Sequence, residues 1–244
     1  MFSNNYYDIS RIEFVLEYYD FFILGIITSI FILVTLIVSG KMIYRGIIKH
    51  NKLIIYTGIA AFGVGGCWFG AGLNFLCIIL FNIIPPWEIY FILHGGIVPF
   101  TLTFWIVATT ELLMYKEKNR EIIKVISAIL AIIVLIIYIY IVFTNRDLIG
   151  TPISPIQARF GPFSFIYLSG LLVIFLFFGG NFVKESLTAK DSKIKLKGKY
   201  LAIFLIMFTI SSILEVFFQE TWLLAIARIT IMVSSIFFYF GFLK

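Results

Sequence analysis

The stretch that decides the fold is residues 200–243, YLAIFLIMFTISSILEVFFQETWLLAIARITIMVSSIFFYFGFL. It contains two mostly apolar runs, each of about 20 residues, the length that an α-helix needs to cross the hydrocarbon core of a bilayer. Only the short polar turn Gln219-Glu220-Thr221 separates the two runs. A turn this short predicts that the two helices are antiparallel neighbours in a membrane.

Five more apolar runs precede this pair. The chain has 244 residues, of which 61% are hydrophobic and 13% are charged, and its mean hydropathy is +1.04. A soluble domain is about half apolar and about a quarter charged. The sequence therefore predicts an all-α fold, a polytopic bundle of seven transmembrane helices in the cell membrane that forms a single domain over residues 1–244. The expected helices are residues 21–39, 53–83, 88–115, 121–143, 163–183, 200–219 and 222–243.

The basic residues predict the orientation of the bundle. Most of the 19 lysines and arginines lie in the connections 41–52, 116–124 and 184–199, all on one side of the predicted membrane. Cytoplasmic loops carry such an excess of lysine and arginine, so the N-terminus is expected outside and the C-terminus in the cytoplasm. The net charge of +6 has the same origin, and we expect the lipid bilayer, not a nucleic acid, as the partner of these residues.

Three segments outside the predicted helices are informative. Residues 1–20 are expected to form either an amphipathic helix on the outer surface or a polar tail. The proline-containing loop Thr144–Pro162 is long enough to fold over the outer end as a lid. The lysine-rich connection Lys184–Lys199 is expected to contact anionic lipid, and docking of a cytoplasmic or membrane protein partner is the alternative.

Small residues mark the second and third runs. Gly66 and Gly70 form a GxxxG pattern, which lets helix backbones approach closely. Packing within the chain is the expected use of this face, and homodimerisation through it is a second interpretation. In the third run, Pro99 follows Gly95-Gly96, and a kink is expected there because proline removes a backbone hydrogen bond.

Ionisable residues inside membrane helices are expensive and commonly functional. Glu215 and Arg228 lie at similar distances from the 219–221 turn, so the sequence predicts that they pair. In one interpretation, this pair only pins the sixth helix to the seventh. In the other, it belongs to an outward-facing polar pocket for a ligand. The residues expected to line that pocket are Glu215, Arg228, His94, Asn74, Tyr90 and Trp68.

Several chemistries lack their residues. Cys67 and Cys77 are separated by about 15 Å of helix rise and are not expected to form a disulfide with each other. The chain has only two histidines, His50 and His94, and neither a bis-histidine haem nor a histidine-rich zinc hydrolase is expected from so few. No Walker A, HExxH or GxSxG motif occurs. We therefore expect no metal site, no cofactor and no enzymatic activity.

The seven-helix plan with an outer N-terminus resembles that of microbial rhodopsins. Rhodopsins hold retinal on a lysine inside the seventh helix, whereas here the only lysine beyond residue 222 is the terminal Lys244. Retinal is therefore not expected.

Five stretches carry a closer resemblance. They are TELLMYKEK (110–118), SPIQARF (154–160), KIKLKGKYLAI (193–203), TISSILE (209–215) and ARITIMVSSIFFYFGF (227–242). Together they resemble a group of archaeal seven-helix integral membrane proteins of unassigned activity, which are similar to the N-terminal seven-helix sensor modules of histidine kinases. The resemblance implies membrane sensing, with the signal passing to a separate partner.

The sequence thus favours a receptor-like sensor module that binds a small ligand or lipid in the outer half of the membrane. A small-solute transporter and a non-catalytic assembly subunit are the alternatives.

Overall fold

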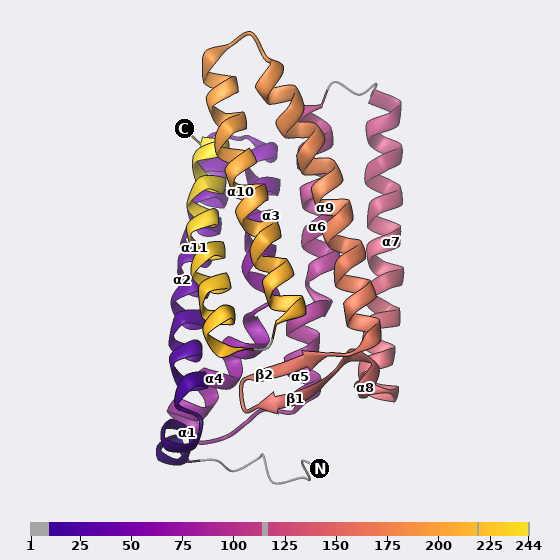
Figure 1. The fold of residues 1–244 in the computed structure, drawn as a ribbon. Helices are drawn as coiled ribbons and strands as arrows, with labels where there is room; N and C mark the ends of the chain where they lie inside the picture. The colour runs from indigo at the N-terminus through magenta and orange to yellow at the C-terminus, as the bar shows by residue number, and fades with distance from the viewer. Residues whose placement is uncertain (1–9, 114–116, 219, 244) are drawn as a thin grey trace.

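The computed structural model describes residues 10–113, 117–218 and 220–243, which form one bundle of long helices (Figure 1). A two-stranded β-hairpin lies across one end of the bundle, which we call the hairpin end (Figure 1). The connection between α9 and α10 lies at the other end, which we call the lysine end. The elements are α1 (Arg11–Glu17), α2 (Tyr19–Ile48), α3 (Lys52–Gly66), α4 (Phe69–Phe81), α5 (Trp87–Phe91), the π-helix η1 (Ile92–Gly96), α6 (Val98–Leu112), α7 (Glu117–Thr144), α8 (Arg146–Ile149), β1 (Gly150–Ser154), β2 (Gln157–Phe160), α9 (Pro162–Thr188), α10 (Ser192–Phe217) and α11 (Thr221–Leu243).

Within these described residues, six helical segments are long and apolar enough to cross a membrane, or seven if α3 and α4 count as one bent span. The all-helical class predicted from the sequence is therefore confirmed, with helices that could cross a membrane and with the β-hairpin as an addition. Several helices extend beyond the predicted limits. Lys41 and Arg45, expected in a connection, lie on α2, and α10 begins at Ser192, where the side chain of Asp191 accepts a hydrogen bond from the backbone N–H of Lys193 at 2.8 Å.

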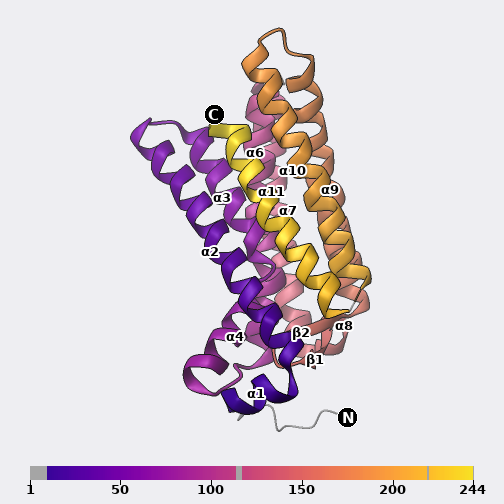
Figure 2. The ribbon, with the colours of Figure 1, turned by 60° about the vertical axis from the view of Figure 1, so that its left-hand side comes forward.

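The second apolar run is not one straight helix. It is bent by 60° between α3 and α4, at Cys67 and Trp68. Glycine is a poor helix former, and Gly65 and Gly66 directly precede the break. The bend carries α4 to the hairpin end, where it lies beside α1 (Figure 2).

The predicted close packing of the small residues is real at Gly70 and looser at Gly66. A Cβ atom at Gly70 would lie 2.5 Å from the backbone oxygen of Tyr90, whereas one at Gly66 would lie 3.4 Å from the nearest atom, on Ile97. Gly70 therefore lets α4 lie against α5 within the same chain. Homodimerisation through this face stays a prediction.

The third run is irregular upstream of Pro99. Pro99 itself sits in the first turn of α6, where its missing N–H costs little, and the wide turn η1 precedes it. The hydroxyl of Tyr138 donates to the backbone oxygen of Phe91 at 3.0 Å, and that of Tyr167 donates to Gly95 at 2.8 Å. Two tyrosines from α7 and α9 thus satisfy carbonyls around the irregular turn.

The predicted loop 144–162 is ordered as α8 and an antiparallel hairpin of β1 and β2, in which Gly150 pairs with Phe160. Ile156, between the strands, is fully buried in a cluster with Phe14 of α1 and Phe75 of α4. The segment is therefore ordered and folded across the hairpin end, whereas its place outside the membrane and its role as a lid stay predictions. Of the predicted outer segment, α1 is helical, and residues 1–9 lie outside the described part.

Candidate functional site

The predicted ion pair between α10 and α11 is present. Arg228 Nε donates to Glu215 Oε1 at 2.9 Å, and the two side chains are only 1% and 6% exposed. The short turn between the helices makes them antiparallel neighbours, and the two residues face each other across that contact. A buried charge of this kind is stable only when it is paired and its remaining hydrogen-bonding groups are satisfied.

Arg228 also has two partners that the sequence did not indicate. Its Nη1 donates to Thr28 Oγ1 on α2, and its Nη2 donates to Gln157 Oε1 on β2 at 2.7 Å. Thr28 Oγ1 donates its own hydrogen to the backbone oxygen of Leu24 at 2.6 Å, which leaves its lone pairs for the guanidinium. One side chain thus ties α2, α10, α11 and the β-hairpin together. We call these contacts the arginine network.

Trp68 joins the network at the break between α3 and α4. Its indole Nε1 donates to Glu215 Oε1 at 3.0 Å. The same carboxylate oxygen therefore accepts from Arg228 and from Trp68, and three of the six predicted site residues meet at one atom.

The other three predicted residues lie differently. Asn74 donates through Nδ2 to the backbone oxygen of Pro155 at 3.1 Å, so it fastens the hairpin from α4. Tyr90 and His94 stack with an interplanar angle of 6° and ring centroids 5.9 Å apart. His94 also lies against Phe160 of β2, at a centroid distance of 5.0 Å.

His94 is the unusual member of the set. It is 7% exposed, and neither Nδ1 nor Nε2 makes a hydrogen bond of good geometry within the described residues, although the backbone of Cys67 lies close enough to interact with the ring. A neutral imidazole has one donor and one acceptor nitrogen, and leaving a buried polar group unpaired costs about 1–3 kcal/mol. Native proteins rarely carry such a group without a reason.

His94 lines a cavity of about 140 Å³. His94, Trp68 and Glu215 line it together, whereas Tyr90, Arg228 and Asn74 are not among its described lining residues. The rest of the wall is mostly apolar and comes from α3, α6, α9, α10 and β2. The cavity therefore has three polar side chains, His94, Trp68 and Glu215, on the wall of a mostly apolar chamber.

The cavity reaches the surface between α9 and α10. On α10 it is lined by the exposed side chains of Ile213 and Phe217, and on α9 by the half-buried Ser169 and Leu172. On the hairpin end, Phe160 of β2 forms part of the wall. The exposed edge of the cavity thus lies between two helices that are long and apolar enough to cross a membrane.

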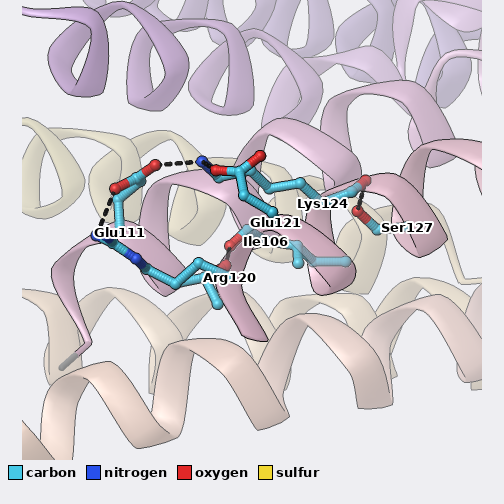
Figure 3. Close-up of polar contacts among 7 residues, drawn as sticks. Ile106, Glu111, Arg120, Glu121, Lys124 and Ser127 are labelled. Carbon is cyan, nitrogen blue, oxygen red and sulfur yellow. Dashed lines mark hydrogen bonds and ion pairs between the residues drawn. The ribbon is translucent and has the colours of Figure 1, made fainter. Parts of the chain in front are cut away.

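A second polar cluster lies far from the cavity, at the lysine end. Glu111 of α6 accepts from Arg120 Nη1 at 3.0 Å and from Lys124 Nζ, and Lys124 also pairs with Glu121 at 2.8 Å (Figure 3). Glu111 thus pairs with basic residues of α7 at the end of its helix. These side chains are partly exposed, and such pairs contribute little stability.

Among the described residues, no group of three or more histidine, cysteine, aspartate or glutamate side chains could hold a metal ion. Comparisons with protein-family models, with curated proteins and with solved structures find no match to this chain. The resemblance to archaeal seven-helix membrane proteins therefore stays a prediction.

Proposed function

We propose that the chain is a receptor-like membrane protein that binds an apolar ligand with one hydrogen-bonding group in the cavity between α3, α6, α9 and α10. In this proposal it crosses the bilayer seven times, with the hairpin end outside and the lysine end in the cytoplasm. The observation that carries the proposal is His94, whose two buried ring nitrogens make no hydrogen bond of good geometry at the wall of an apolar cavity. A ligand that bonds to His94 recovers the cost of leaving that group unpaired.

The size of the cavity suggests what kind of ligand fits. A dry protein cavity of roughly 150 Å³ holds a molecule the size of benzene. The cavity here is about 140 Å³, so it accommodates a small polar head or ring with little room beyond it. A longer ligand would extend between Ser169 and Ile213 into the bilayer. We therefore favour a membrane-dissolved amphiphile that enters sideways over a water-soluble ligand that enters past the hairpin.

The arginine network connects the cavity to other elements of the fold. Glu215 lines the cavity and also holds Arg228, which in turn contacts Thr28 and Gln157. A ligand group that competes for Glu215 would favour a different arrangement of α10, α11 and the hairpin, and a ligand shifts an equilibrium by its preference for one state. In this proposal the change is read at the lysine end, where the Lys184–Lys199 segment would meet a separate partner.

Native mass spectrometry of the gently solubilised protein tests the proposal. Ser169→Trp fills the cavity, and Val173→Trp places the same side chain one turn further along α9, on an exposed position outside the cavity. We expect a bound molecule on the wild type and on Val173→Trp, and its loss from Ser169→Trp and from His94→Phe. A protein that carries no bound molecule, or one that all three variants retain equally, contradicts the proposal.

A further inference from the structure

A groove at the lysine end is a separate feature from the cavity. It lies over α6, which packs against α3 on one side and α7 on the other, and it has a volume of about 820 Å³. Tyr56 of α3, Phe104 and Val107 of α6, and Ala128 of α7 are among its lining residues. The rings of Tyr56 and Phe104 are 5.8 Å apart, and the half-exposed Phe100 continues the strip, 5.0 Å from Phe104.

The end of the groove is basic because a tight connection joins α2 to α3. His50 adopts a left-handed conformation with φ 49°, which ends α2, and the side chain of Asn51 accepts hydrogen bonds from the N–H groups of Leu53 and Ile54 to begin α3. This connection fixes Lys49 and Lys52 at the groove, and both are exposed. Lys124 of α7 approaches from the opposite wall.

The nearby carboxylates do not cancel this charge. Glu111 and Glu121 are paired with Arg120 and Lys124 (Figure 3). Two carboxylates thus neutralise two cations, and no ion pair within the described residues engages Lys49 or Lys52. The groove therefore combines two unpaired ammonium groups with an apolar aromatic strip on a lipid-facing flank.

We propose that this groove binds one anionic phospholipid from the leaflet at the lysine end. The phosphate lies against Lys49 and Lys52, and an acyl chain lies along Tyr56, Phe104 and Phe100. Free phosphate would gain nothing from the aromatic strip, whereas a phospholipid uses both halves of the groove. The site is independent of the cavity at the hairpin end, so neither proposal depends on the other.

The test measures retention of phosphatidylglycerol. The protein is placed in phosphatidylcholine nanodiscs that contain a small fraction of phosphatidylglycerol, and native mass spectrometry counts the anionic lipids that remain bound. The variant is Lys49→Gln with Lys52→Gln. The matched control, Lys193→Gln with Lys195→Gln, removes the same charge from exposed positions of α10 in the lysine-rich segment.

Each lysine near an anionic lipid surface contributes about 1 kcal/mol, which is roughly a fivefold change in affinity. We expect the double variant to bind phosphatidylglycerol about 30-fold more weakly. The control should weaken binding less, because Lys193 and Lys195 can attract anionic lipid but are not among the lining residues of the groove. Ala128→Trp, which fills the groove without a change of charge, is also expected to lose the lipid. Equal retention in the groove variants, equal loss in the control, or displacement of the lipid by inorganic phosphate would each overturn the proposal.

Discussion

Removing Glu215 should destabilise the protein far more than removing both members of its ion pair. Glu215→Leu leaves the guanidinium of Arg228, which is 1% exposed, with only the neutral partners Thr28 and Gln157. Breaking a buried pair by removing one partner costs about 3–5 kcal/mol, because it leaves a buried charge uncompensated. The variant also deprives the indole of Trp68 of its acceptor, which adds about 1 kcal/mol. We expect a loss of unfolding free energy of about 4–6 kcal/mol.

The double variant Glu215→Leu, Arg228→Met removes both charges. Replacing a buried pair by apolar residues of similar size is often neutral, so this variant is expected to be more stable than Glu215→Leu alone. Glu111→Leu is the control, because its ion pairs at the lysine end are partly exposed and should contribute about 0–1 kcal/mol.

The assay is reversible unfolding by dodecyl sulfate in mixed micelles, followed by tryptophan fluorescence. It gives the free energy of unfolding of the wild type, of Glu215→Leu and Arg228→Met alone and of the double variant, and hence the coupling energy of the pair. A Glu215→Leu variant that loses less than about 1 kcal/mol, or a double variant whose loss is the sum of the single losses, would refute the description of the arginine network.

Three further predictions concern packing and backbone. Gly70→Ala should cost about 1–3 kcal/mol, because its Cβ would meet the backbone oxygen of Tyr90, whereas Gly66→Ala should cost under about 1 kcal/mol; equal effects in the unfolding assay would contradict the packing. Asn74→Ala should cost about 1 kcal/mol and speed proteolysis of the hairpin, and unchanged cleavage rates would argue against its hydrogen bond. Pro99→Ala should change the melting temperature by no more than a few degrees, since proline in a first turn gives up no intrahelical bond; a large loss of stability would show that Pro99 maintains the irregular turn.

The sequence predicted the contact between residues whose helices are joined by a short turn. Glu215 and Arg228 could be paired because a short turn forces their helices to be antiparallel neighbours, so distance from the turn fixes both depth and proximity. Asn74 shows the limit of the same reasoning. The sequence predicts Asn74 in the pocket with Glu215 and Arg228, but α4 is bent by 60° against α3, and Asn74 bonds to Pro155 of the hairpin instead.

The remaining partners come from elements whose positions the sequence does not reveal. Thr28 is one hydroxyl in an apolar run, and its role depends on the rotation of α2 about its axis. Gln157 lies in a segment that the sequence predicts as a loop. The pairing register of β1 with β2 places its side chain at Arg228. No proline in the sequence marks the position of the bend between α3 and α4. Gly65 and Gly66 permit the break. At the break, the indole of Trp68 donates a hydrogen bond to Glu215.

The most direct test of the central claim is an experimental structure of the protein purified from its native membrane. The proposed function predicts a bound molecule in the cavity, with a polar atom at hydrogen-bond distance, about 2.7–3.2 Å, from a ring nitrogen of His94. The rest of that molecule should run between α9 and α10 toward lipid. An empty cavity, or a His94 side chain turned to bond with another group of the protein, would contradict the account.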